Sequence, residues 1–482
     1  MVTVNRSDIE IRPDPTRVVA KPFLPGETTF AGGPTRVELI ADRALQLSKP
    51  EASRLLERTR ASFAGRHLDL ENVWEENVTA ATAQYPDLEQ VVGERRALLG
   101  AFFTQEYAPE AAAVCNPSMV PLSEPNTDGR FILSLRAIGE GHISSVEFRS
   151  GYVDSEGSAQ LDAPTPYLSL GSRRTPIYEN KTFRDKLVAL NADPTLVGVV
   201  MDQLPDRFSF TELEAALDLM QRGEVSGASA FETSRLIQWL AASNYELSFS
   251  GAEPISERVL LPASPAESRG IEDARFVRFV EEDDTTTYYA TYTAWDGFSI
   301  LPQLIETRDF VTFRFATLNG ACARNKGMAL FPRRIGGLYT AIGRHDLENL
   351  HILRSDQLRV WNHSELLCAP ERGWETVQLG TCGSPIETPE GWLVLTHGVG
   401  PMRTYALGAL LLDLERPTQV IGRLETPLLE ADPDERDGYV PNVVYSCGAM
   451  AHAGWLVIPY GFSDRAVRIA KVALDELLEA MV

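Results

Sequence analysis

The fold is decided by the stretch Ser268-Arg269-Gly270-Ile271-Glu272-Asp273-Ala274-Arg275-Phe276, in which two adjacent carboxylates follow a glycine and stand between two arginines. Apolar runs lie on either side, at residues 258–261 and 276–280, and another follows at residues 288–294. On an exposed loop such a cluster would be ordinary surface charge. Between apolar strands it indicates a turn at the mouth of a β-structure, with its charges directed at a pocket. A carboxylate held between arginines stays ionised or finds a partner, and it can serve as an acid, a base or a sugar anchor.

The charge balance of the chain limits its partners. The 482 residues allow two to three domains with ample core, and a content of 44% hydrophobic and 23% charged residues is ordinary for a globular protein. The 45 basic and 67 acidic residues give a net charge of −22, which argues against nucleic acid and anionic membranes as partners. An anionic substrate stays compatible with this charge, because a local arginine cluster can invert the sign inside one cleft.

Cysteine and histidine usage predicts no metal and no disulfide framework. The five cysteines are scattered without CxxC spacing, which favours buried, inert thiols in a reducing compartment. The seven histidines show no metal-binding spacing. We see no apolar signal-peptide core near the N-terminus and no run of about 18 apolar residues, so we expect a cytoplasmic protein.

The first part of the chain, residues 1–108, is predicted to be an N-terminal arm followed by a helical module. Residues 17–23 and 36–40 are expected to be short strands or extended arms. A capping box at Ser48 and Glu51, with Pro50 early in the helix, predicts a helix to about Gly65, and apolar spacing predicts two more before residue 108. Apolar helical faces do not reveal their partner, so a dimerisation or lid element and a packing appendage both stay open.

Residues 109–472 are predicted to be rich in strands, with a helical insertion at about residues 181–242 and a short helix in residues 473–482. A loose repeat of a turn, an aromatic residue and alternating apolar residues recurs roughly every 50 to 60 positions, the spacing of propeller blades. The four clear repeats and a weaker fifth favour a five-bladed β-propeller over a β-sandwich. The repeats lie at residues 288–293, 337–342, 391–395, 454–458 and, for the weaker one, 130–135.

The motif Gly-x-Glu-Asp-x-Arg at residues 270–275, followed by the aromatic strand at 288–294, resembles glycoside hydrolase family 130. That family consists largely of inverting β-mannoside phosphorylases on a five-bladed β-propeller. The resemblance covers roughly residues 110–472, and the helical additions are similar to those of its longer members. Ala274 departs from the pattern, because most members have proline there, but the change removes no functional group. Three further segments match in order: 325–333, 391–399 and 438–444.

The resemblance implies that Asp273 is the general acid, which passes its proton through the mannose 3-hydroxyl to the glycosidic oxygen. From composition alone, Asp273 and its neighbouring arginines are equally typical of a structural ion pair. The further residues that we expect to contact the sugar are Asn116, Arg136, Glu272, Asn325, Tyr405 and Asp464.

A second cluster is basic. Six basic residues lie within about thirty positions of an acidic chain, and guanidinium forks and a lysine charge suit phosphate oxygens, although part of the cluster is typical of a solvated face. Arg333 is the alternative to Arg334, because the register of this segment is open. The expected phosphate ligands are Arg314, Lys326, Arg334, Arg344, His397 and Arg403.

One acid that faces a cationic cluster is the arrangement needed for inverting phosphorolysis. Inverting hydrolysis needs two carboxylates with a water between them, whereas phosphate is already an anionic nucleophile and needs only to be held in line. The arrangement favours an inverting phosphorylase, and the resemblance implies a β-mannoside substrate, α-mannose 1-phosphate as the product and, through the longer members, β-1,2 linkages. Phosphate is its co-substrate and no cofactor is expected. Helical appendages are compatible with a homodimer or larger assembly.

Two alternatives stay open at this point. One is a β-mannoside hydrolase on the same scaffold, in which Glu365, Glu387 or Asp464 supplies the second carboxylate. The other is a propeller without catalytic activity that binds sugars, in which Asp273 would be tied into a closed ion pair.

Overall fold

The computed structural model describes residues 2–26, 33–124, 127–222 and 228–481, which form two compact units. The β unit contains residues 1–13, 112–164 and 170–482, and the helical unit contains residues 14–111 with 165–169. The predicted boundary of a single module at 1–108 is therefore wrong at its start. Strand β1 (Asn5–Ile11) pairs antiparallel with the last strand, β30 (Ala466–Ala473), and so belongs to the β unit.

The helical unit packs its helices around a small apolar core that includes Val37, Val78 and Phe103. The capping box at Ser48 and Glu51 begins α2 as predicted. The extended segment predicted at residues 36–40 is wrong, because a second capping box, at Thr35 and Glu38, begins a helix there. The elements of this unit are α1 (Arg36–Gln46), α2 (Lys49–Phe63), α3 (Leu70–Thr82), α4 (Glu94–Phe102) and the paired strands β2 (Val19–Pro22) and β3 (Thr104–Tyr107).

The β unit begins with two antiparallel groups of strands that meet at one parallel pair, Ser144 with Gly270. The first group is β4 (Ala113–Pro121), β5 (Arg130–Ile138), β6 (Ser144–Val153) and β7 (Ala159–Leu161). The second is β14 (Gly270–Val280), β15 (Thr286–Trp295), β16 (Ile300–Thr307) and β17 (Thr312–Thr317). Short strands flank them: β8 (Ser169–Leu170), β9 (Ser172–Arg174), β12 (Tyr245–Ser248) and β13 (Arg258–Leu260).

Three more antiparallel groups follow along the chain. The third is β18 (Ala329–Leu330), β19 (Tyr339–Gly343), β20 (Leu350–Ser355) and β21 (His363–Cys368). The fourth is β22 (Gln378–Thr381), β23 (Ile386–Thr388), β24 (Gly391–Val399), β25 (Tyr405–Leu412) and β26 (Val420–Arg423). The fifth is β27 (Val444–Tyr445), β28 (Met450–His452), β29 (Trp455–Phe462) and β30, with β1 at its edge, and α9 (Leu474–Glu479) follows it.

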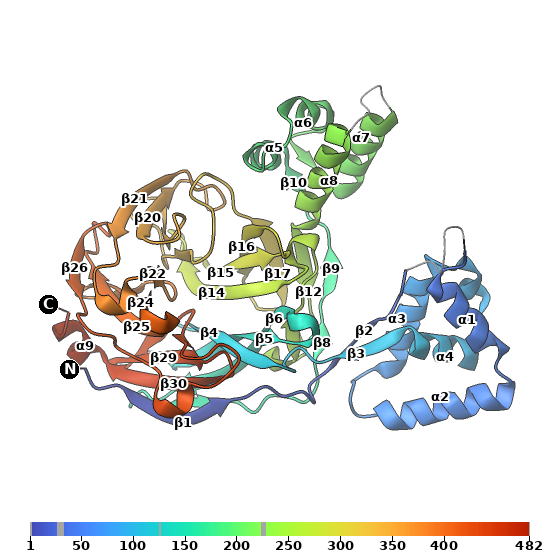
Figure 1. Cartoon of the computed structure of the whole chain (residues 1–482), viewed down its shortest axis with the longest axis horizontal. Helices are drawn as coiled ribbons and strands as arrows, with labels where there is room; N and C mark the ends of the chain where they lie inside the picture. Colours follow the sequence, from blue (N-terminus) through green and yellow to red (C-terminus); the bar gives the residue numbers. More distant parts are fainter. Residues whose placement is uncertain (1, 27–32, 125–126, 223–227, 482) are drawn as a thin grey trace. The chain divides into compact units, whose positions relative to one another are not determined.

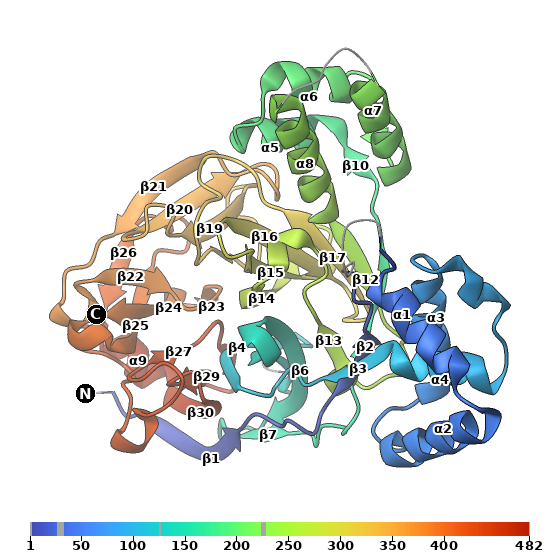
Figure 2. The same ribbon diagram turned by 45° about the vertical axis from the view of Figure 1, so that its right-hand side comes forward.

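The five groups succeed one another around the β unit, and the last lies beside the first (Figures 1 and 2). Cys447 N donates to Pro117 O at 2.7 Å and Met119 N donates to Gly448 O at 3.2 Å, which joins the fifth group to β4. Apolar side chains fill the spaces between neighbouring sheets. The prediction of a mainly β chain is confirmed.

The helical insertion lies where the sequence predicts it and has its own core, around Phe183, Leu213 and Ile237. Figure 1 shows its helices in green, standing on one edge of the sheets. Ser209 and Glu212 form a capping box at the start of one of its helices. Among the described residues, no helix is long and apolar enough to cross a membrane. The insertion consists of α5 (Asn180–Ala189), α6 (Pro194–Met201), α7 (Phe210–Arg222), α8 (Ala228–Ala242) and the strand pair β10 (Tyr178–Glu179) and β11 (Arg207–Phe208).

Candidate active site

Asp273 sits in a bulge of β14. The pairing of β14 with β15 is interrupted between Glu272 and Arg275, and Asp273 has a φ of 56°. Such a bulge turns a side chain away from the regular alternation of the strand. Gly270 permits the close start of the strand: its φ is +131°, and a Cβ there would lie 2.2 Å from Ser144 Oγ and 2.8 Å from Ser144 N. The bulge and the glycine together set the direction of the two carboxylates.

The two neighbouring carboxylates are held differently. Arg136 Nη2 donates to Glu272 Oε1 at 2.7 Å, and Lys326 Nζ donates to Glu272 Oε2. The Asp273 carboxylate lies 3.6 Å from Arg136 Nη1 and 3.8 Å from Arg275 Nη2, which is beyond hydrogen-bond distance. Its side chain is 14% exposed. Both oxygens of Glu272 thus accept hydrogen bonds from cations. The carboxylate oxygens of Asp273 lie near two arginines but accept no hydrogen bond from either guanidinium.

A cluster of cations and rings lies beside Asp273. Arg275 Nη2 donates to Tyr445 OH at 2.8 Å, and the ring of Tyr445 lies 4.7 Å from that of His397 between centroids. Arg344 lies close enough to Arg275, Tyr445, Tyr405 and Asp273 for these groups to influence its pKa. Its Nε and Nη1 atoms are buried and have no hydrogen-bond partner among the described residues. A half-buried guanidinium with two such atoms is suited to bind an anion.

The electrostatics keep His397 neutral. Burial, followed by the charges of Arg344 and Arg275, holds the pKa of His397 well below its usual range. Burial also lowers the pKa of Arg344; Tyr445 opposes this shift and Arg275 adds to it. His397 is 1% exposed, and as a neutral ring it can form a hydrogen bond with a ligand without adding a positive charge to those of Arg275 and Arg344.

A third carboxylate, Asp464, belongs to the same site. It lies in the turn between β29 and β30 with a φ of 46°. Burial raises the pKa of Asp464 to about 6; Arg136 opposes the shift and Asp273 adds to it, which shows that all three groups share one electrostatic environment. All five cysteines are free and buried, and burial raises the pKa of Cys115 and Cys447 close by, so both stay uncharged thiols.

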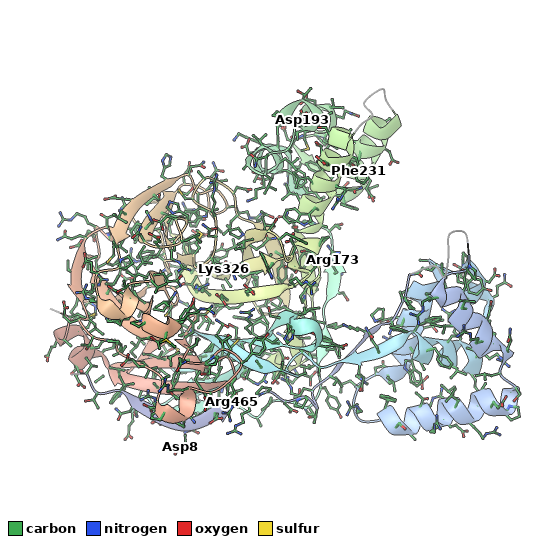
Figure 3. All side chains as sticks on the ribbon, viewed as in Figure 1. Asp8, Arg173, Asp193, Phe231, Lys326 and Arg465 are labelled. Carbon is green, nitrogen blue, oxygen red and sulfur yellow. The ribbon has the colours of Figure 1, made fainter. Side chains whose placement is uncertain are left out.

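Other predicted residues also border this site. Asn116 lies at a bulge in β4 with a φ of 45°, and its buried Oδ1 has no partner in the described part of the chain. Asn325, next to Lys326, donates from Nδ2 to His345 O at 2.6 Å. Figure 3 labels Lys326 near the middle of the β unit. Arg403 lies with its guanidinium carbon 6.0 Å from the Tyr405 ring centroid.

Two predicted phosphate ligands lie elsewhere. Arg314 on β17 is 60% exposed and donates from Nε to Glu246 Oε2 at 3.0 Å. Arg334 donates to Glu281, which follows the end of β14 that is remote from Asp273; eight residues at about 3.3 Å each place the two Cα atoms up to roughly 26 Å apart. The alternative, Arg333, pairs with Glu387 at 2.6 and 2.8 Å. Each of the three arginines is paired with a glutamate in this structure.

The sequence analysis missed two residues of the cluster. Arg275 belongs to the quoted motif, but the motif alone does not reveal that its guanidinium faces the site as well as Asp273. Tyr445 follows directly after the matched segment 438–444, and only the fold brings it beside Arg275. The arginine two positions after the Glu272-Asp273 pair is the sequence signal that could have indicated Arg275.

The chain is similar in sequence to one family of known proteins. Residues 244–482 match the profile of glycoside hydrolase family 130, described as beta-1,4-mannooligosaccharide phosphorylase. A beta-1,2-mannobiose phosphorylase of Listeria innocua is 32% identical over 229 residues, 46% of this chain and 63% of that protein, so the match spans less than two thirds of that relative. A 1,2-beta-oligomannan phosphorylase of Thermoanaerobacter is 31% identical over 232 residues, 46% of this chain and 75% of that protein.

Among solved structures, the beta-1,2-mannobiose complex of the Listeria innocua phosphorylase superposes with a TM-score of 0.46 and 22% identity, covering 78% of this chain and 98% of that one. The family resemblance expected from the four sequence segments is confirmed by the profile match and by the Thermoanaerobacter relative, three quarters of which is matched. The chain belongs to glycoside hydrolase family 130.

Proposed function

We propose that this protein is an inverting β-mannoside phosphorylase that acts on β-1,2-linked manno-oligosaccharides. The observation that carries the proposal is one loosely paired carboxylate, Asp273, beside the buried Arg275 and the half-buried Arg344, whose Nε and Nη1 atoms have no partner among the described residues. The names of the Listeria and Thermoanaerobacter relatives support the substrate class and the β-1,2 linkage.

In this reaction the bond between the anomeric carbon and the glycosidic oxygen breaks, and a phosphate oxygen bonds to that carbon from the opposite face. Asp273 gives a proton, relayed by the mannose 3-hydroxyl, to the leaving oxygen and becomes a carboxylate. Arg136 and Arg275 lie close enough to stabilise that carboxylate. Phosphate would be held by Arg344, Arg275 and His397, with Lys326 and Arg403 at the edge.

Hydrolysis on the same scaffold is the second candidate, and Asp464 is the observation in its favour. A base needs a pKa near the working pH, and burial places that of Asp464 at about 6 beside Asp273. The other two candidates for the second carboxylate are not supported. Glu387 is paired with Arg333, and Glu365 is exposed on β21.

We also infer that the β unit is a five-bladed β-propeller. Its five consecutive antiparallel groups and the pairing of β1 with β30 in the last group support this architecture. A cytoplasmic location and an assembly of two or more copies stay predictions from the sequence.

The test is phosphate dependence. The purified protein is incubated with β-1,2- and β-1,4-mannobiose, with and without phosphate, and mannose 1-phosphate and free mannose are measured. We expect mannose 1-phosphate from the β-1,2 substrate only when phosphate is present. Asp273→Asn should lower the rate by about 10²–10⁴-fold while leaving the melting temperature unchanged. Free mannose formed regardless of phosphate would favour the hydrolase, and near-normal activity of Asp273→Asn would remove that residue from its role.

A further inference from the structure

The segment 318–327 connects β17 to β18 and brings a cation to the site. It contains no helix or strand, and its residue Lys326 donates to Glu272, the carboxylate next to Asp273. The position of this segment therefore decides where the ammonium group lies. The contacts that hold this segment in place come from residues that have no assigned role in the reaction.

Residues at both ends of the helical insertion form hydrogen bonds at the start of this segment. Lys186 on α5, only 6% exposed, donates from Nζ to the carbonyl of Leu318 at 2.7 Å. Asn244, just after α8, accepts from Thr317 N at 2.9 Å and donates to Thr317 Oγ1 at 3.1 Å. The two ends of the insertion thus hold two consecutive residues where the segment leaves β17.

Lys186 also acts electrostatically on the other end of the segment. Burial lowers the pKa of Lys186 to about 8, and the charge of Arg324 adds to that shift, so Arg324 lies near this ammonium group. Arg324 directly precedes Asn325 and Lys326. A buried lysine costs free energy unless its charge is used, and here it bonds one end of the segment and repels a cation at the other.

The middle of the segment is fixed independently of the insertion. Asn319 N donates to Arg359 O and Trp361 N donates to Asn319 O, both at 2.8 Å. Gly320 has a φ of +99°, and a Cβ there would lie 2.2 Å from Trp361 O. The segment therefore has a fixed centre, so loss of Lys186 would leave it folded and would act on its two ends, at Leu318 and beside Arg324.

We infer that Lys186 is a positioning residue: through the segment 318–327 it sets the place of Lys326 against Glu272. The consequence for catalysis rests on the proposed function, whereas the mechanical link does not. The helical insertion would then support the segment that carries Lys326 into the active site.

Hydrogen exchange tests the mechanical link without reference to activity. In Lys186→Met, peptides that cover residues 318–327 should exchange about tenfold faster than in the wild type, because one anchor of the segment is lost. The control is Lys181→Met on the same helix, which is 89% exposed and should change nothing. Should Lys186→Met fail to fold, Asn244→Ala takes its place. Unchanged exchange in a folded variant would overturn the inference.

A double-mutant cycle tests the catalytic consequence. Lys186→Met should lower kcat/KM for phosphate about tenfold, less than Lys326→Met, and Lys186→Arg should restore part of the loss. The double variant should be no worse than Lys326→Met alone, because both changes act through the same ammonium group. Additive losses would mean that Lys186 acts only on general stability and would refute the role. A wild type without phosphate-dependent turnover would refute the proposed function, while the exchange result would still decide the mechanical link.

Discussion

Replacing Arg344 by methionine should separate phosphate binding from folding. The Nε and Nη1 atoms of Arg344 are buried without a partner among the described residues, and the neighbouring charge of Arg275 adds to the burial that lowers its pKa. Methionine keeps much of the apolar stem and removes the charge. The free protein therefore loses no hydrogen bond at those atoms, and its free energy of unfolding should stay within about 1 kcal/mol of the wild type or rise.

The loss should instead appear in phosphate affinity. A guanidinium that binds phosphate through two charge-assisted hydrogen bonds contributes about 1.5–3 kcal/mol for each, or roughly 3–6 kcal/mol together. Since about 1.4 kcal/mol corresponds to a factor of ten, the dissociation constant for phosphate should rise by about 10²–10⁴. Affinity for the mannoside alone should not change, because Arg344 is assigned to the phosphate and not to the sugar.

Denaturant unfolding at increasing phosphate concentration measures both effects. At 100 times the wild-type dissociation constant, phosphate should stabilise the wild type by about 2.7 kcal/mol and the variant by about 0.4 kcal/mol or less. Arg334→Met is the matched control, because that arginine pairs with Glu281 away from the site and should leave the phosphate response intact. The reasoning is refuted by an Arg344→Met protein that unfolds about 2 kcal/mol more easily yet keeps the full phosphate response.

Two further changes test the carboxylate side of the site. The folded state binds the proton of Asp464 more tightly than the unfolded chain, since its pKa is raised from 3.8 to about 6. The contribution of Asp464 to stability should therefore fall as the pH rises from 4 to 6, and Asp464→Asn should gain about 2–3 kcal/mol relative to the wild type over that range in denaturant unfolding; parallel pH profiles would contradict this. Gly270→Ala places a Cβ 2.2 Å from Ser144 Oγ and should lower stability by about 2–4 kcal/mol together with activity. An unchanged melting temperature would show that the start of β14 is not constrained as described.

The sequence predicts the acidic half of the site better than the basic half. Glu272 and Asp273 are adjacent, so one motif identifies both. The bulge in β14 helps to direct both carboxylates to the same site. Which arginines join them depends on the folded chain: Arg314 and Arg334 pair with the glutamates Glu246 and Glu281, whereas two nitrogens of Arg344 have no partner among the described residues. Capping boxes and apolar spacing locate most helices from the sequence, as at Ser48. Every capping box has to be considered, because the one at Thr35 also begins a helix.

The pairing of β1 with β30 has a consequence for shortened versions of the protein. Strand β1 pairs with β30, which lies far along the chain, so the fifth sheet cannot be complete until residue 473 has left the ribosome. Deleting residues 1–111 to remove the helical unit would also delete β1 and expose the edge of β30 to another chain, a route to aggregation. A shortened protein that retains the β unit should join residue 13 to residue 112 by a linker.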